Sequence, residues 1–359
     1  MNKTFTFDDL LDIRSGDHEL FFSGGGYSEI ITLSNCEQWE SKADALKKLF
    51  VQTLGVIPEN IDTELNPEMV SEQQCDGYIK RKIMLNLTVD ERIDTYLLIP
   101  DNLIEKAPAV LCLTPTTDIG KEQTIGNGTT EKDTDRAYAL HLVKQGYITF
   151  TFDWDSAGTR QYPDLQPFDN APFYKKYPHW SAIGKNIWDI EKAIDYLVGL
   201  AEVDSSRIAS LGHSQGGGAT IYAMAMDKRI KLGISSCGGF PMKMAKNPFN
   251  HARNQWWIGR PLLRPYCLTG KAFPADVHEL LALCAPRPFL YIAALNDCQY
   301  SLEETDITKP ALKNMETNVR KVYGLQDADE MFRVLLHSNG HSFIKEQRDV
   351  AYKFLDKYL

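Results

Sequence analysis

The stretch LGHSQGGGAT, residues 211–220, places one serine between two glycines in the spacing G-x-S-x-G. Gly212 and Gly216 stand two residues on either side of Ser214, and more glycines follow. Glycine loses the most backbone freedom on folding, so this cluster indicates a sharp bend where two segments must approach closely. RIASL before it is typical of a strand and ATIYAMAM after it of a helix. In that setting the motif exposes a nucleophilic serine.

A strand-to-helix turn at Ser214 would place the backbone N–H of Gln215 in the first turn of a helix. Amides there lack intrahelical acceptors, and the helix dipole favours negative charge. We therefore expect the N–H of Gln215 to bind the oxyanion of a tetrahedral intermediate. A second donor usually comes from the loop after the third strand, here LCLTPTTDIG. We expect it to be the N–H of Thr116, with Thr117 as the alternative.

A serine nucleophile also requires a base. Four histidines follow Ser214: His251, His278, His337 and His341. His278 lies in a helical pattern and is expected at the surface, and His337 ends the strand FRVLLH. His341 lies in the turn between the last strand and the final helix. Because a loop beyond the carboxyl end of that strand can reach the serine, we predict His341 as the base.

The acid that orients the base should follow the preceding strand, RPFLYIAAL, in the same way. Asp297 lies just past the end of that strand and is our prediction. Asn296, Glu303, Glu304 and Asp306 are the competitors.

The elements that must position these residues alternate between strands and helices. YIKRKIMLNL and RIDTYLLIP are predicted as two antiparallel strands. APAVLCLT and YITFTFDWD are nearly continuous apolar runs, as expected of strands buried on both faces. Helices are expected in TDRAYALHLVKQG and in IGKNIWDIEKAIDYLVGL. The alternation predicts an α/β fold with a mixed, mostly parallel central sheet flanked by helices.

Two regions of the chain differ in their sequence patterns. Residues 1–77 are expected to form an N-terminal extension that packs on the core, with one clear helix that stops at Gly55. Residues 78–359 are expected to form the catalytic domain.

Within that domain, residues 239–275 are a cap-like excursion rich in aromatic residues, Arg and Pro. Such long connections are often functional. Trp256, Trp257, His251 and Tyr266 could line an acyl or sugar pocket. Alternatively, they only bury the excursion on the core, because aromatic side chains bury large areas in either role.

Composition excludes several classes of protein. The formal net charge is −9, which argues against nucleic-acid partners and, more mildly, against anionic membranes. The N-terminus lacks the apolar core of a secretory signal. Seven cysteines without a CxxC pair indicate reduced thiols in a cytoplasmic protein, with neither a disulfide framework nor a zinc site. We expect no metal or organic cofactor, and the sequence leaves open whether the chain forms a homo-oligomer.

Several stretches resemble the α/β-hydrolases, and within them the dienelactone hydrolase and bacterial acetyl xylan esterase groups. WDIEKAIDYLVGLAEVDSSRIASLGHSQGG resembles their run from helix to serine turn. APRPFLYIAALND resembles their strand leading to the acid, and NGHSF resembles the Gly-His-x-Phe around their histidine. The resemblance covers roughly residues 80–359 and implies the α/β-hydrolase fold. It implies the same roles for Ser214, Asp297 and His341 as a triad, and for Gln215 and Thr116 at the oxyanion hole.

The chain also departs from these groups. Thr114 stands where they usually have a histidine that braces the oxyanion loop, and Ser342 where the deacetylases have Glu. DWDSAGTRQ stands in place of their Arg-Gly-Gln motif. There, Asp153 and Arg160 are expected to form an ion pair that fixes the loop, with substrate binding as the alternative.

Together these observations predict a serine esterase that acts through an acyl-enzyme. The resemblance points to small acyl groups, such as acetyl on a carbohydrate or a related small molecule. The alternatives are a serine peptidase or thioesterase of the same fold, and a non-catalytic hydrolase-like binding protein. A peptidase of the prolyl oligopeptidase kind would usually carry a β-propeller, for which 359 residues leave no room. A binding protein would require a broken triad.

Overall fold

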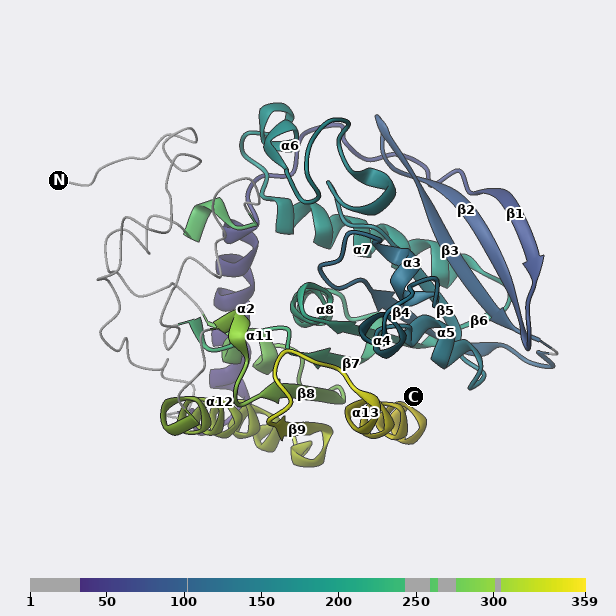
Figure 1. Cartoon of the computed structure of the whole chain (residues 1–359). Helices are drawn as coiled ribbons and strands as arrows, with labels where there is room; N and C mark the ends of the chain where they lie inside the picture. The colour runs from purple at the N-terminus through teal and green to yellow at the C-terminus, as the bar shows by residue number, and fades with distance from the viewer. Residues whose placement is uncertain (1–32, 102, 243–258, 264–275, 301–304) are drawn as a thin grey trace.

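The computed structural model describes residues 33–101, 103–242, 259–263, 276–300 and 305–359 (Figure 1). Its centre is a nine-stranded sheet with the strand order β1-β2-β3-β5-β4-β6-β7-β8-β9. The strands are β1 (Glu68–Gln74), β2 (Tyr78–Thr88), β3 (Glu91–Pro100), β4 (Ala107–Leu113), β5 (Ile148–Phe152), β6 (Val203–His213), β7 (Ile230–Ser236), β8 (Phe289–Ala294) and β9 (Phe332–His337).

The sheet is antiparallel at one side and parallel at the other. β1, β2, β3 and β5 pair antiparallel in that order. β5, β4, β6, β7, β8 and β9 pair parallel. The predicted mixed sheet and its antiparallel pair are therefore confirmed. The sequence did not reveal β1, because every residue of this edge strand is exposed and it carries no apolar alternation.

Apolar side chains on both faces of the parallel strands explain their continuous apolar runs. In β4, Ala109, Leu111 and Leu113 belong to the core cluster on one face of the sheet. Val110 and Cys112, between them, belong to the cluster on the other face. This alternation is the pattern expected of a strand covered on both sides.

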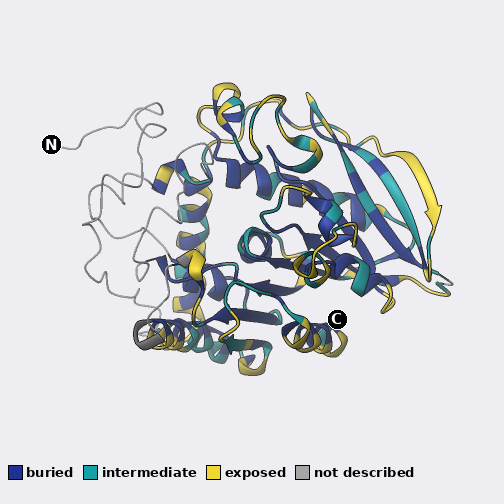
Figure 2. Cartoon of the chain, viewed as in Figure 1, coloured by how far each residue is buried: buried dark blue, intermediate teal, exposed yellow. Residues whose placement is uncertain are grey.

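Helices cover both faces (Figure 1). On one face lie α2 (Cys36–Thr53), α7 (Ala182–Gly199), α8 (Gln215–Met226), α11 (Val277–Ala282) and α12 (Thr305–Leu325). On the other lie α5 (Tyr138–Val143) and α13 (Lys345–Tyr358). Figure 2 shows the central strands and the inward sides of these helices as buried, β2 as partly buried and β1 as exposed. The shorter helices are α3 (Lys121–Thr124), α4 (Glu131–Asp135) and α6 (Ala171–Lys176), with 3-10 turns η3 (Gly158–Arg160), η5 (Pro261–Leu263), η6 (Cys298–Tyr300) and η7 (Asp329–Met331).

The helix expected over TDRAYALHLVKQG is divided in two. α4 ends at Asp135, and α5 begins only at Tyr138. Between them, Ala137 has a ψ of 40°, which is outside the helical range. Arg136, in this break, is buried, and its Nη2 lies 3.2 Å from Nε2 of His213.

The described part of the N-terminal region contacts the rest of the molecule. Trp39, Leu46 and Phe50 of α2 lie in the same core cluster as the sheet. The rings of Phe50 and Tyr222 meet edge to face, with centroids 5.9 Å apart. The chain reverses after α2 at Gly55, which has a φ of 84°. The division into residues 1–77 and 78–359 stays a prediction. No helix in the described part of the chain is long and apolar enough to cross a membrane.

Candidate active site

The serine turn lies between β6 and α8, at the parallel half of the sheet. Ser214 has φ 57° and ψ −119°, a conformation that a non-glycine residue adopts only under strain. A Cβ on Gly212 would overlap the backbone of Gly216, and a Cβ on Gly216 would overlap the carbonyl oxygen of Leu113. The two glycines are therefore required by close approach, as the spacing predicted.

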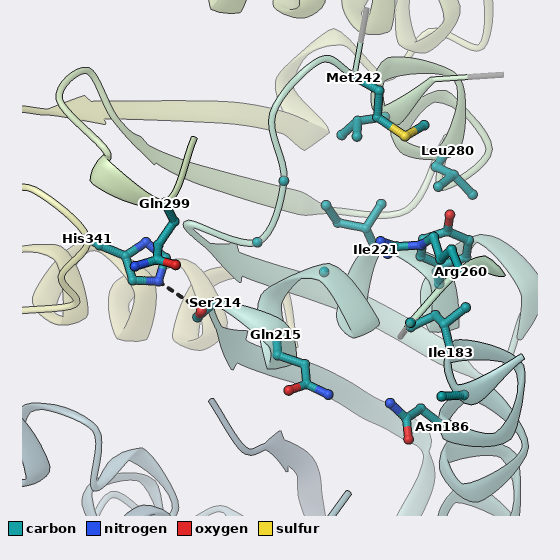
Figure 3. Close-up of a pocket in the computed structure, with 17 residues that line it drawn as sticks. Ile183, Asn186, Ser214, Gln215, Ile221, Met242, Arg260, Leu280, Gln299 and His341 are labelled. Carbon is teal, nitrogen blue, oxygen red and sulfur yellow. Dashed lines mark hydrogen bonds between the residues drawn. The ribbon is translucent and has the colours of Figure 1, made fainter. Parts of the chain in front are cut away.

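Ser214, His341 and Asp297 form a hydrogen-bonded chain. His341 Nε2 lies 2.8 Å from Ser214 Oγ, and Figure 3 shows this contact as a dashed line. His341 Nδ1 lies 2.8 Å from Oδ2 and 3.0 Å from Oδ1 of Asp297. Asp297 is 2% exposed. The geometry fits an imidazole that holds its proton on Nδ1 and can accept one on Nε2.

Two loops that follow neighbouring parallel strands bring the base and the acid together. Leu295 N donates to His337 O at 2.8 Å, where both strands end. Beyond that point, Asn296 Nδ2 donates to Ser338 O at 3.1 Å, and Gly340 N donates to Asn296 Oδ1 at 2.9 Å. Asn296, a competitor for the acid in the sequence, instead joins the acid loop to the histidine loop.

The other candidate bases and acids lie elsewhere. His337 is half-buried, accepts a hydrogen bond from Asn339 N at 3.3 Å, and has a pKa lowered by burial. The expected surface position of His278 is wrong, because all six residues of α11 are buried. His251, Glu303, Glu304 and the side chain of Asp306 lie outside the described residues.

Backbone amides suited to an oxyanion lie beside the serine. Gly218 N donates to Ser214 O at 3.0 Å, so the N–H of Gln215 precedes the first helical hydrogen bond of α8 and has no intrahelical acceptor. Thr116 Oγ1 donates to Gln215 Oε1 at 3.3 Å. The loop that carries Thr116 therefore contacts the residue after the serine, and the role of the Thr116 N–H stays a prediction.

A buried tryptophan contacts the loop that carries Thr114. Trp154 is 1% exposed, and its Nε1 donates to the carbonyl oxygen of Thr114 at 2.8 Å. Tyr138 OH donates to the adjacent carbonyl of Leu113. These two donors hold the loop after β4 from its backbone, so a histidine side chain is not needed at position 114.

His213, the residue before the serine, is a site residue that sequence reasoning missed. Its Nδ1 lies 3.0 Å from Ser236 Oγ, and its ring stacks on Phe343 at an interplanar angle of 5°. Its centroid lies 4.9 Å from that of His341. Complete burial, together with the charge of Arg136, holds the pKa of His213 well below its usual range. A neutral ring therefore packs behind His341. In the sequence, the only signal for His213 was its place directly before Ser214 in the G-x-S-x-G motif.

One set of ligand atoms in the described part of the chain is close enough together to suggest a metal: those of Cys237, Asp297 and His341, within 4.8 Å of one another. Metal binding needs a deprotonated thiol. Burial and the nearby charge of Asp297 raise the pKa of Cys237 to about 12. Both ring nitrogens of His341 are already engaged. The donor set therefore fits a hydrogen-bonded chain better than a metal centre.

The predicted ion pair between Asp153 and Arg160 is not formed. The Asp153 carboxylate accepts from Lys121 Nζ at 2.7 Å, whereas Arg160 pairs with Glu91 at 2.6 Å and Asp189 at 2.8 Å. Arg160 reaches Asp153 only through the backbone carbonyl oxygen, at 2.7 Å. The loop is fixed as expected, but by partners that are distant in the sequence.

A pocket opens beside Ser214 and His341 (Figure 3). It is bounded by the start of α7, by α8, by the segment after β7 and by α11. The lining residues are Ala182, Ile183, Asn186, Ser214, Gln215, Gly218, Ile221, Tyr222, Gly238, Gly239, Met242, Gly259, Arg260, Val277, Leu280, Gln299 and His341. Trp256, Trp257, His251 and Tyr266, which were expected here, lie outside the described residues.

Comparisons with known proteins agree with this geometry. "Putative hydrolase YtaP" of Bacillus subtilis (strain 168) is 26% identical over 322 residues, which make up 89% of this chain and 100% of that protein. "Carbohydrate esterase MZ0003", from an unknown prokaryotic organism, is 29% identical over 181 residues, or 46% of this chain and 39% of that protein. A glucuronoyl esterase from Solibacter usitatus shares the fold, with a TM-score of 0.69 and 18% identity over 93% of this chain and 98% of that one.

The predicted α/β-hydrolase fold is thereby confirmed. A model of the abhydrolase family matches residues 27–226, which is more than half of the chain and includes the serine turn. The chain belongs to the abhydrolase family.

Proposed function

We propose that this protein is a carboxylic ester hydrolase that acts through an acyl-enzyme on Ser214. The observation that supports the proposal most directly is the 2.8 Å contact between His341 Nε2 and Ser214 Oγ, on a serine held in a strained turn beside a pocket. A serine becomes nucleophilic when a base of this kind can take its proton.

In the proposed reaction, Ser214 Oγ attacks the ester carbonyl while His341 Nε2 takes the hydroxyl proton. His341 then gives that proton to the departing alcohol, and an acyl-enzyme remains. Water attacks the acyl group, with His341 again as the base, which releases the acid and restores Ser214. Asp297 holds the Nδ1 proton and stabilises the imidazolium that forms in each half of the reaction.

The negative charge of each tetrahedral intermediate would be bound by the N–H groups of Gln215 and Thr116. What supports Gln215 is its place before the first hydrogen bond of α8, where the helix dipole also favours an anion. What supports Thr116 is the contact between its hydroxyl and the Gln215 side chain. One such donor is worth about 3 kcal/mol in the transition state.

For the substrate, we propose an ester of a carbohydrate or a related small molecule, with a small acyl group such as acetyl. The names of two similar proteins, a carbohydrate esterase and a glucuronoyl esterase, support the carbohydrate part. The acetyl group rests on the resemblance of the sequence motifs to acetyl xylan esterases.

The experiment is to compare wild type, Ser214→Ala and Ser205→Ala on p-nitrophenyl acetate and to label each with a serine-reactive phosphonate. We expect Ser214→Ala to lose at least about 10³-fold in kcat and to escape labelling, while its melting temperature stays near that of wild type. Ser205 is an exposed residue of β6, so its variant should behave as wild type.

Two outcomes would contradict the proposal. One is a Ser214→Ala variant that retains a tenth of the wild-type rate. The other is a wild type that neither turns over the ester nor takes the label, which would favour a binding protein. Faster turnover of matched thioesters or peptides than of esters would reassign the reaction while keeping the nucleophile.

A further inference from the structure

One polar side chain of the pocket has a buried atom without a partner. Asn186, on α7, is 5% exposed and lines the same pocket as Ser214 and His341. No described residue donates a hydrogen bond to its buried Oδ1. A buried acceptor left in this state destabilises the fold, and most such atoms in proteins are satisfied.

A second carboxamide faces it. Figure 3 shows the side chains of Gln215 and Asn186 pointing toward each other from α8 and α7. Oε1 of Gln215 is engaged by Thr116 Oγ1 at 3.3 Å, and its Nε2 is turned toward Asn186. This side of the pocket therefore offers an N–H donor on Gln215. Figure 3 shows the nitrogen of Asn186 on the side of Gln215 and its oxygen on the far side, and a half turn of the carboxamide would exchange the two.

Much of the remaining wall of the pocket is apolar, although Arg260 and Gln299 also line it. Ile183 lies one helical turn before Asn186, and Ile221, Met242 and Leu280 line the space farther from the histidine (Figure 3). These side chains cannot satisfy a carboxamide. A ligand that occupies this pocket must therefore carry apolar surface together with a group that can both donate and accept hydrogen bonds.

A hydroxyl group has this chemistry. It can accept from Gln215 Nε2 and can either accept from Nδ2 or, after the half turn, donate to Oδ1 of Asn186. A carboxylate only accepts, so it would leave Oδ1 without a donor. An alkyl group would leave both carboxamides unsatisfied.

We propose that Asn186 binds a hydroxyl group of the substrate and so selects esters of hydroxylated ring compounds over their plain hydrocarbon counterparts. This inference rests on the ester hydrolase activity proposed above and deepens it. Discrimination of this kind is strong, because a substrate without the hydroxyl leaves the buried polar groups of the site unpaired.

The test uses two pairs of esters in which one member carries a hydroxylated sugar ring and the other a plain cyclohexane ring. In the first pair, methyl 6-O-acetyl-glucopyranoside and cyclohexylmethyl acetate, the hydroxyls lie on the alcohol. In the second, methyl glucuronate and methyl cyclohexanecarboxylate, they lie on the acyl group. For wild type we expect kcat/KM to be at least about tenfold higher for the hydroxylated member of one pair.

In Asn186→Leu this preference should fall by about tenfold, mainly through KM. Asn186→Ala, which introduces no bulk, should reduce the preference in the same direction. Glu191→Gln, at an exposed position of the same helix, is the matched control and should keep the wild-type ratio.

The proposal is overturned if wild type hydrolyses both members of each pair equally well, or hydrolyses only p-nitrophenyl acetate. It is also overturned if the Asn186 variants lose the same factor on both members, since a water-filled or purely structural site would behave in that way. Failure of the ester hydrolase activity itself looks different, because wild type would then turn over no ester, or Ser214→Ala would remain active.

Discussion

Two of the clusters of buried acids and bases in the described part of the chain differ in what can reach them. In the first, Asp297 bonds His341, and the chain of hydrogen bonds ends on Ser214 at a pocket. In the second, Arg160 and Asp189 pair with each other, 6% and 0% exposed. Both clusters contain a buried carboxylate paired with a base. The feature that distinguishes a reactive site is the accessible nucleophile at the end of the chain, not burial or pairing.

The second cluster joins three segments that are far apart in the sequence. Lys185 on α7 contacts Glu91 at 2.6 Å and also pairs with Asp189 on its own helix. Arg160, in the loop after β5, pairs with the same two acids. Because α7 also carries Asn186, this cluster fixes one wall of the pocket without facing it. Its role is to hold the shape of the site.

The sharpest test of the first cluster separates its histidine from a nearby one. We expect His341→Ala to lose at least about 10³-fold in kcat on p-nitrophenyl acetate, close to the loss in Ser214→Ala, because such residues act as a unit. Asp297→Asn should be milder but still severe. His337→Ala is the control, and its kcat should stay within a few-fold of wild type. A silent His341→Ala with an inactive His337→Ala would reassign the base.

The second cluster should respond in stability and not in chemistry. Arg160→Ala removes a partner from two acids, one of them fully buried, so we expect the free energy of unfolding to fall by about 3 kcal/mol. Urea denaturation measures this loss, and kcat per folded molecule should change by no more than a few-fold.

Arg207→Ala is the matched control for that change, since Arg207 pairs with Asp204 at the surface and should contribute less than about 1 kcal/mol. Equal losses in the two variants would mean that burial does not set the strength of these pairs. A stable but inactive Arg160→Ala would give the cluster a direct part in the reaction.

The smallest expected effect is a pH dependence at Asp155, a buried neighbour of the second cluster. Burial, opposed by the charge of Arg160, raises the pKa of Asp155 to about 6. A carboxyl whose pKa is higher in the folded state stabilises the fold below its unfolded value, and that contribution is lost as the pH rises through about 6. Asp155→Asn should therefore gain stability relative to wild type between pH 4 and pH 7, measured by urea denaturation at several pH values.

A difference between Asp155→Asn and wild type that stays constant over this range would contradict the raised pKa. Asp204→Asn serves as a reference in which the pH dependence of stability has the opposite sign. Hydrogen bonds from Ser206 and Arg207 lower the pKa of Asp204 to about 2. That variant should lose stability relative to wild type as the pH rises from about 2 to about 4, and the difference should then stay level through the range in which Asp155 titrates.

The residues at the ends of strands were the part of the site that the sequence could indicate. Ser214, Asp297 and His341 each follow a strand of the parallel half closely, and the carboxyl ends of such strands meet at one edge. Each of these strands can be predicted from its own segment of sequence, and that is enough to place the three residues near one another. The same reasoning found the sheet itself from its apolar runs.

Contacts between distant segments could not be predicted from the sequence. The nearness of Asp153 and Arg160 in the chain suggested a pair, but their partners come from other elements. The helical pattern around His278 says nothing about how many sides of α11 are covered. Asn186 is one polar residue in the sequence of a predicted helix, and only the fold shows that it lines the pocket and has an unpartnered oxygen.

The crowding at the serine turn also limits how this chain can evolve. A Cβ on Gly217 would come within 2.8 Å of Ser236 O, and one on Gly216 would overlap Leu113 O. Most substitutions at these glycines would therefore disrupt the turn. Divergence toward new substrates, in nature or in a directed-evolution library, must therefore accumulate on α7 and around residues 238–242 and 259–263. The reaction would be inherited unchanged while the specificity drifts.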